Sequence, residues 1–299
     1  RGPSRQIRLV GSEAAWPEAG ALAASGPESR TRGPQKYKNV MKRHLAVVVT
    51  QALLCIALAV LAAPVCQAGP AVEKLPFRPG EKLHYTVYWL QIEAAEAELE
   101  ILPFEKIDGA EGWHFVMTAK TSELVENIFP VFDRMDAYAD RKLTHALLYK
   151  EHKQTRKQKD IAVFFNWKNK SVTYMKKSKR RAPVKLLDGA FDPLSIFYYF
   201  RAQQLQEHQE LERPVSDGKK CIVGKARVRG REKVTVAGKS FDTFLVEPDL
   251  TGIGGVFEKS PDARLQIWVT ADERKIPVLV KSEVAVGSFT AELDSITIK

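Results

Sequence analysis

Cysteine is scarce in this chain of 299 residues, which contains only Cys55, Cys66 and Cys221. Cys55 and Cys66 lie in or at the end of an N-terminal apolar run, so a chain that lost this run would keep Cys221 alone. A single cysteine cannot form an intramolecular disulfide, which excludes the small disulfide-stapled folds of many secreted domains. Stability must therefore come from a hydrophobic core, for which a hydrophobic content of 44% is sufficient.

The sequence signatures of catalysis are also missing. None of the six histidines has a Cys, Glu or second His at the spacing of a metal site, and there is no nucleophile elbow or Walker loop. Glu96, Glu98 and Glu100 alternate with apolar residues, but three glutamates on one strand face indicate a solvated surface. We therefore expect no metal, no cofactor and no catalytic residue.

The N-terminal part of the chain has the pattern of an export signal. Residues 1–40 are rich in Gly, Pro, Ser, Ala and Arg, which predicts disorder, and one interpretation is a leader translated from upstream of Met41. Residues 41–68 then give a basic start, a long apolar run and a small-residue end, which predicts a cleavable signal peptide with Gly69 as the new N-terminus. This places the protein in a bacterial periplasm. Residues 45–65 have about the length that spans a bilayer, so the alternative is an inner-membrane anchor.

Residues 69–299 are predicted to form a single β-rich domain, because apolar and polar residues alternate with period two in most segments. One strand, 83–90, is apolar on both faces and is expected to be central. The other predicted strands cover 95–101, 113–119, 134–139, 144–155, 160–165, 171–176, 220–228, 232–236, 241–246, 264–270, 278–286 and 289–298. Short polar turns between them predict an antiparallel meander, and about a dozen strands must form a strongly curved sheet, an incomplete barrel or a sandwich.

One main helix is predicted at about 192–206, where Asp192 suits the N-cap and Pro193 the first helical position. Its apolar residues fall on one stripe, which is typical of a core helix: Leu194, Phe197, Tyr198 and Leu205. A shorter helix is expected within 122–132, interrupted by Pro130. Asp133 and Asp136 follow this proline and are interpreted as capping or turn residues.

Charge is unevenly distributed. The segment from Lys150 to Lys185 has 13 basic and 2 acidic residues, a net charge of +11. Residues 1–68 carry +6 of the chain's +10, so residues 69–299 carry +4 and, outside this segment, −7. We expect contact with an anionic envelope surface at five of these residues: Lys176, Lys177, Lys179, Arg180 and Arg181. The alternative is that these charges only protect a sheet edge from pairing, and nucleic acid is not expected as a partner.

Four segments in order resemble one family of exported bacterial proteins, the domain-of-unknown-function family 3108. The first is Phe77, Pro79, Gly80, Glu81, Leu83, Tyr85, Val87 and Trp89; the second is the helix from Asp192 to Arg201. The third is Gly230, Arg231, Glu232, Val234, Gly238, Phe241 and Thr243; the fourth is Ile267, Trp268, Asp272 and Pro277. The resemblance implies an envelope protein of mostly β structure and assigns no activity.

The sequence supports two functional hypotheses and one less favoured alternative. The first is a noncatalytic periplasmic binding or carrier domain for an apolar or anionic envelope ligand such as lipid, lipopolysaccharide or polysaccharide, with peripheral membrane contact. Its candidate ligand contacts are four aromatic residues: Tyr85, Trp89, Tyr198 and Trp268. The second is an assembly factor or scaffold that binds another envelope protein through a sheet edge. The third is a hydrolase acting on envelope polymer.

Overall fold

A computed structural model describes residues 61–62, 75–127, 130–154, 158–251, 260, 262–285 and 287–299. The predicted leader at 1–40 lies outside these residues. So do the predicted signal peptide and the alternative anchor, except for 61–62. Among the described helices none is both long and apolar enough to cross a bilayer.

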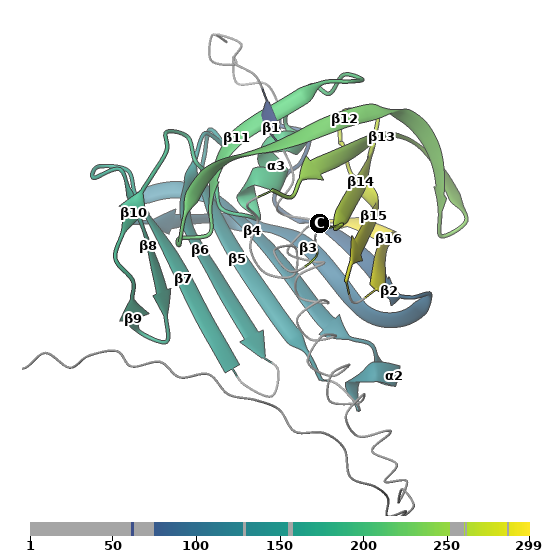
Figure 1. Ribbon diagram of the computed structural model, residues 1–299, viewed down its shortest axis with the longest axis horizontal. Helices are drawn as coiled ribbons and strands as arrows, with labels where there is room; N and C mark the ends of the chain where they lie inside the picture. Colours follow the sequence, from purple (N-terminus) through teal and green to yellow (C-terminus); the bar gives the residue numbers. More distant parts are fainter. Residues whose placement is uncertain are drawn as a thin grey trace, which may run out of the picture.

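The first half of the sheet, which we call the N-terminal arm, is a series of antiparallel neighbours (Figure 1). Its strands are β2 (Glu81–Trp89), β3 (Ile92–Ile107), β4 (Ala110–Thr121), β5 (Phe132–Asp140), β6 (Ala146–Gln154), β7 (Gln158–Asn166) and β8 (Ser171–Lys176). The short strands β9 (Lys179–Arg180) and β10 (Val184–Lys185) both pair with β8. The arm is thus a meander, as short turns between amphipathic strands require.

The second half, the C-terminal arm, continues the same sheet. Its strands are β11 (Glu210–Ser216), β12 (Cys221–Val236), β13 (Lys239–Asp249), β14 (Arg264–Thr270), β15 (Pro277–Val284) and β16 (Gly287–Ile298). The last strand, β16, pairs antiparallel with β2, so the two ends of the domain meet in the middle of the sheet. A two-residue strand, β1 (Leu61–Ala62), pairs in parallel with β11. The predicted antiparallel, strongly curved sheet with one main helix is confirmed.

A short connection links the two arms where the sheet does not close. The Ala146 N–H at the start of β6 donates to the Ala190 carbonyl oxygen at 3.0 Å, and the Phe191 N–H donates to the Pro214 carbonyl oxygen in β11 at 2.9 Å. Phe191 also accepts from the Ser216 N–H at 2.9 Å. Ala190 and Phe191 therefore connect β6 to β11 through backbone hydrogen bonds.

Helix α3 (Ser195–Arg201) lies on the inner side of this barrel, between the two arms (Figure 1). Its Tyr198 ring stacks on Phe115 of β4, with the ring centroids 3.8 Å apart. We call the face of the N-terminal arm that carries Phe115 the inner face. The opposite, outer face of β2 is only half-buried, so the expectation that this strand is apolar on both faces was wrong, although its central position is confirmed.

The buried guanidinium of Arg201 closes the core at the end of α3. It forms two hydrogen bonds to the Glu81 carboxylate, at 2.6 and 3.2 Å, and two to the Arg274 carbonyl oxygen, each at 3.2 Å. The Phe77 and Tyr198 rings lie beside it, 5.2 and 5.6 Å from the guanidinium carbon. This buried charge is paired and hydrogen-bonded, as stability in a low-dielectric interior demands.

Both helices differ from their predicted bounds. α3 begins at Ser195 and ends at Arg201, so it is shorter than 192–206. The Asp192 carboxylate still accepts the first free N–H groups, from Leu194 at 2.8 Å and from Ser195 at 2.9 Å, as its predicted capping chemistry requires. The second helix, α2 (Glu123–Glu126), is a single turn rather than a segment reaching residue 132.

Two strand predictions also need correction. β11 was missed, because Pro214 interrupts its pattern; as the last long strand of its arm, β11 tolerates a residue that cannot donate a ladder hydrogen bond. The predicted strands 220–228 and 232–236 form one strand, β12, with a register shift between Val228 and Gly230. An extra residue at a bulge breaks the period-two alternation without ending the strand.

A candidate binding surface at one end of the sheet

Cross-strand rows on the inner face change from apolar to basic along the N-terminal arm. In one row the residues in register, from β2 to β7, are Tyr85, Ala97, Ala119, Asp133, Lys153 and Lys159. In the next row, from β2 to β8, they are Leu83, Leu99, Met117, Met135, Glu151, Ile161 and Lys176. Residues in register point to the same face, so lysines gather on the inner face of β6–β8.

Further cations join these lysines from two hairpins. Lys179 is in register with Lys176 and shares its face, while Arg181 lies over the Tyr174 ring at 5.3 Å. Lys219 approaches the same ring from the β11–β12 turn, at 5.2 Å. We call this group the basic rim. Its members are Lys153, Lys159, Lys176, Lys179, Arg181 and Lys219.

A glycine places the β11–β12 turn against the basic rim. Gly218 has a φ of +80°, and a Cβ added there would lie 2.8 Å from a methyl carbon of Val163 and 3.2 Å from Cβ of Tyr174. Only glycine combines this backbone conformation with so close an approach to β7 and β8. Lys219 is therefore fixed over the inner face although it is distant in sequence from the rest of the rim.

The rim has few compensating acids. Lys153 pairs with Glu151 at 3.3 Å and Lys219 with Asp217 at 3.3 Å. Within the described ranges no carboxylate forms an ion pair with Lys159, Lys176, Lys179 or Arg181. Burial lowers the pKa of Lys159, and the nearby lysines lower it further against the opposing effect of Glu151. A site with this charge favours an anion.

Asp133 lies directly inside the rim, in register with Lys153 and with Ala119. Its side chain is 2% exposed, and neither carboxylate oxygen has a hydrogen-bond partner. Burial raises the pKa of Asp133 to about 7, against a smaller opposing effect of Lys153. The interpretation of Asp133 as a capping or turn residue was wrong, because β5 begins one residue earlier, at Phe132.

Asp136, also expected in a cap or turn, lies on the outer face of the same strand. Its carboxylate accepts hydrogen bonds from Arg134 at 2.9 and 2.7 Å and contacts His114 Nε2 at 2.8 Å. Although burial acts to raise it, the pKa of Asp136 is held at about 2 by the hydrogen bonds and charges of His114 and Arg134. The other ring nitrogen of His114 contacts Glu105 at 3.2 Å. The polar groups of this network bind one another, so the Asp136 carboxylate and the His114 ring are not available to a ligand.

Large apolar side chains are exposed at the same end of the sheet as the basic rim. Leu90 and Ile92, at the β2–β3 turn, are 53% and 58% exposed, and Phe132 at the start of β5 is 42% exposed. The antiparallel order brings these positions to the end at which β6 finishes and the β8–β9 turn lies. α2 lies at this end too and carries Glu123 and Glu126, so the basic side is that of β6–β9.

The predicted aromatic ligand contacts are spread over several places. Tyr85 is 1% exposed and donates its hydroxyl to the Pro277 carbonyl oxygen at 2.9 Å, and Tyr198 is 1% exposed in the core. Trp89 is partly buried and stacks on Phe289, and Trp268 is buried with its indole N–H donating to a glutamate, Glu232. The structure does not bring the four together, and their role as ligand contacts stays a prediction.

The five predicted anion contacts, in contrast, share one hairpin. Lys177 and Ser178 both have positive φ, 46° and 64°, which is the type I′ turn that links β8 to β9. Arg180 lies over the Phe164 ring at 5.7 Å, on the outer face, whereas Lys176, Lys179 and Arg181 belong to the basic rim. All five side chains are exposed to solvent.

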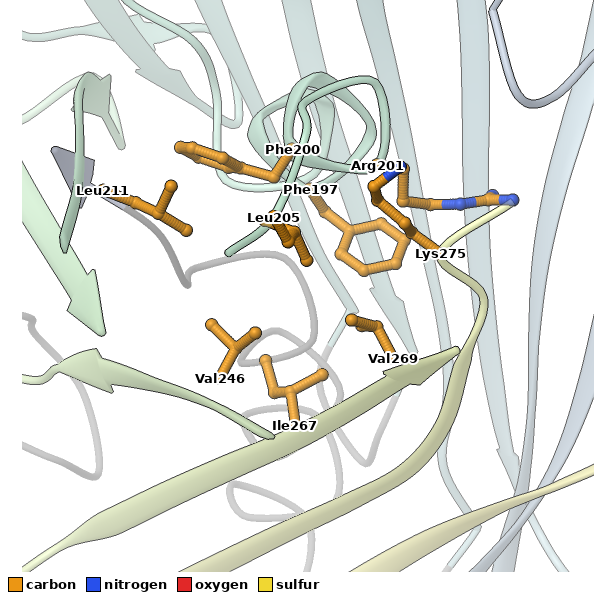
Figure 2. A pocket seen from close by; sticks show the side chains of 9 residues that line it. All are labelled: Phe197, Phe200, Arg201, Leu205, Leu211, Val246, Ile267, Val269 and Lys275. Carbon is orange, nitrogen blue, oxygen red and sulfur yellow. The ribbon is translucent and has the colours of Figure 1, made fainter. Parts of the chain in front are cut away.

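A small pocket lies under α3, beside β13 and β14 (Figure 2). Its volume is about 30 Å³, which is enough for water but too small for an acyl chain. Lys275 and Arg201 contribute their alkyl parts to the lining. The other lining residues are apolar: Phe197, Phe200, Leu205, Leu211, Val246, Ile267 and Val269. In the part of the chain that the structure describes, no cluster of His, Cys, Asp and Glu could hold a metal ion.

Sequence reasoning missed four of the residues that this surface brings together: Asp133, Lys153, Lys159 and Lys219. A signal existed for two of them, because Lys153 and Lys159 alternate in step with Tyr149 and Val163, which are buried on the inner face. No local signal marks Lys219, since its position follows from the packing of a distant turn.

Comparisons with known proteins identify a family and similar solved structures. A crystal structure of a β-barrel-like protein of domain of unknown function DUF1849 from Brucella abortus is similar over 73% of this chain and 97% of that chain, with 9% identity and a TM-score of 0.45. No curated protein matches the sequence. The family model for proteins of unknown function DUF3108 matches residues 84–294, from the central strand to the last one. The chain therefore belongs to the DUF3108 family.

Proposed function

We propose that this protein is a noncatalytic binding domain of the bacterial envelope that docks on anionic lipid headgroups through the basic rim. The observation that carries the proposal is the gathering of six cations, from four strands and two hairpins, at one end of the sheet. Phosphate groups of lipids are the abundant anions of an envelope surface, and each Lys or Arg near such a surface contributes about 1 kcal/mol.

The exposed apolar residues support a membrane as the source of the anion. Leu90, Ile92 and Phe132 lie at the same end as the rim, where they can enter the boundary between headgroups and acyl chains. A free polysaccharide would use the cations but would gain nothing from exposed leucine, isoleucine and phenylalanine.

Vesicle flotation tests the proposal. Purified protein is mixed at low salt with vesicles of phosphatidylcholine alone or with a fraction of phosphatidylglycerol. We expect binding only to the anionic vesicles, and a loss on the order of a hundredfold for the variant Lys176→Gln/Lys179→Gln/Arg181→Gln, since three cations are removed.

A charge-matched variant at the other end of the sheet is the control. Lys106, Lys142 and Lys168 are exposed near the β3–β4, β5–β6 and β7–β8 turns, and their replacement by Gln removes the same charge. This control should keep nearly full binding. Equal losses of binding in both triple variants would show that only the net charge of the protein matters and not the position of the rim. Absence of flotation on anionic vesicles would refute the proposal.

The proposal includes export. A signal peptide at 41–68 would release the domain at Gly69 into the periplasm, where the rim can reach the membrane surface. N-terminal sequencing of the protein recovered from the periplasmic fraction should give Gly69. Recovery only from the inner membrane, with residues 45–65 retained, would instead identify an anchored form.

A second candidate function is a scaffold that binds another envelope protein through a sheet edge. β11 favours it, because its outer edge pairs in parallel with the two residues of β1, which cleavage before Gly69 would remove, and such an edge can accept another strand. Crosslinking in cells from Glu212, a half-exposed residue on this edge strand, should then yield one discrete protein partner. A crosslinked species that appears equally from Lys168 would count against the edge.

A further inference from the structure

The inner face holds one polar group that the docking surface does not explain, the buried carboxyl group of Asp133. Buried polar groups in folded proteins are nearly always hydrogen-bonded, and a buried carboxylate without partners is among the rarest exceptions. Both oxygens of Asp133 lack partners although the side chain is 2% exposed. A purely structural aspartate, such as Asp192 with three hydrogen bonds, is satisfied by its own fold.

The neighbours of Asp133 cannot supply the missing donor. On one side its cross-strand neighbour is Ala119, followed by Ala97, and methyl groups donate no hydrogen bond. On the other side is Lys153, whose ammonium group pairs with Glu151 at 3.3 Å. No donor among the described residues reaches either oxygen of Asp133, so a donor on a bound molecule would satisfy it.

The row that contains Asp133 leads outward to the basic rim. The Asp133 side chain is 2% exposed and that of Lys153 is 15% exposed, and Lys159 beyond it is half-buried at the edge. Lys153 is thus the rim residue next to Asp133, and it lies between Asp133 and Lys159 in the row. A lysine has a long flexible side chain, so Lys153 can move relative to the Asp133 carboxyl group.

We propose, on the basis of the docking function above, that Asp133 accepts a hydrogen bond from a hydroxyl group of the bound lipid headgroup while the basic rim holds the phosphate of that headgroup. Cβ atoms of cross-strand neighbours such as Asp133 and Lys153 lie about 5 Å apart, so one small headgroup can contact both side chains. The six cations of the rim disfavour an ammonium donor at this place, so a neutral hydroxyl fits better than the amine of an ethanolamine headgroup. The ligand class is a phosphodiester lipid with a hydroxylated headgroup.

The test uses two anionic lipids that differ only in their headgroup hydroxyls, phosphatidylglycerol and phosphatidylpropanol. Both carry one negative charge, so the rim cannot distinguish them. At equal fractions in phosphatidylcholine vesicles, the protein should bind phosphatidylglycerol about tenfold more tightly, the value of one buried hydrogen bond to a charged group. Asp133→Ala should bind the two lipids equally.

Two further measurements keep the outcome clear. Chemical denaturation should show that Asp133→Ala is at least as stable as the parent protein, because no internal hydrogen bond is lost; a marked loss of stability would assign Asp133 a structural role and overturn the inference. Soluble glycerol 1-phosphate should compete with the vesicles for the parent protein more strongly than propyl phosphate does. Equal competition by the two esters would contradict the recognition of a hydroxyl.

Failure of this inference is distinguishable from failure of the docking function. If the parent protein binds both anionic lipids equally and the rim variant loses both, docking stands and the role of Asp133 is refuted. If neither lipid is bound, both proposals fall. A preference for phosphatidylethanolamine vesicles that Asp133→Ala abolishes would replace the hydroxyl by an ammonium group and would refute a hydroxylated headgroup as the ligand class.

Discussion

Strand β5 carries one aspartate on each face, and only the one on the outer face is hydrogen-bonded within the protein. Asp136 on the outer face has a pKa of about 2 and is held by Arg134 and His114, whereas Asp133 on the inner face has a pKa of about 7 and no partner. The two residues are three apart in sequence, so propensity and composition cannot explain the difference. The outer carboxylate has all of its hydrogen-bond donors within the protein, whereas the inner one would need an additional donor.

The ion pair between Arg201 and Glu81 is buried in the core, and its loss should change the free energy of unfolding more than any other substitution proposed below. Arg201→Met leaves the buried carboxylate of Glu81 without its partner, so we expect a loss of about 3–5 kcal/mol in the free energy of unfolding. Urea denaturation measures it. The double variant Arg201→Met/Glu81→Gln should recover part of the loss, because the unpaired charge is gone. Equal losses in the single and double variants would show that packing against Phe77 and Tyr198, and not the charge, dominates.

Replacement of Asp133 should raise the free energy of unfolding instead of lowering it. Its folded pKa, about 7, lies above the ordinary value of 3.8, so the folded state binds the proton more tightly than the unfolded state does. The stability contributed by Asp133 is therefore full below pH 4 and is lost as the pH rises through 7. Asp133→Asn should be more stable than the parent at pH 8, by up to about 4 kcal/mol, and no more stable at pH 4.

Thermal or urea unfolding of the two proteins across this pH range checks the prediction. The difference between them isolates Asp133 from Asp192, whose pKa burial also raises, to about 6. A gain in stability that does not change with pH would contradict the shift of the Asp133 pKa.

The outer face should respond with a smaller loss. Asp136 has a folded pKa of about 2, below its ordinary 3.8, so its contribution is present above pH 4 and is lost as the pH falls through 2. Asp136→Asn should cost about 2 kcal/mol at pH 7, because Arg134 and His114 lose a charged acceptor. Urea midpoints measured at pH 7 and at about pH 2.5, where this acid titrates, should show the cost shrinking at the lower pH.

Sequence patterns predicted the meander well because alternation within a strand is local. β14 was predicted with its observed bounds, and the Asp192 carboxylate accepts the N–H groups of Leu194 and Ser195 at the start of α3, although the N-cap position itself is Leu194. The basic segment was also visible, but as a single charged surface. Alternation with the buried Tyr149 and Val163 indicates that Lys153 and Lys159 face inward. Which residues lie beside them depends on the register of β5–β8, and alternation along one strand does not fix that register.

Asp133 and Lys219 could not have been assigned to the site from the sequence. Asp133 follows Pro130 closely, and proline near aspartate is typical of a turn, yet β5 already begins at Phe132. Lys219 reaches the rim only because Gly218 allows a turn of the C-terminal arm to pack on Val163 and Tyr174 of the N-terminal arm. Long-range packing determined both positions.

The smallest expected effect concerns two lysines of the N-terminal arm on opposite faces of the sheet. Lys159 faces inward without an ion pair among the described residues, and burial lowers its pKa; Lys150 faces outward, exposed, with its ammonium 5.4 Å from the Tyr138 ring centre. Because the folded state disfavours the charge on Lys159, Lys159→Met should raise the free energy of unfolding at pH 7, by about 0.5 kcal/mol, and the gain should shrink as the pH approaches 10. Lys150→Met should give no gain. If Lys159→Met is more stable than the parent protein but binds anionic vesicles less tightly, this rim cation lowers stability and contributes to binding, as expected of a functional site. If Lys159→Met is less stable than the parent, Lys159 is a stabilising charge like those of the outer face.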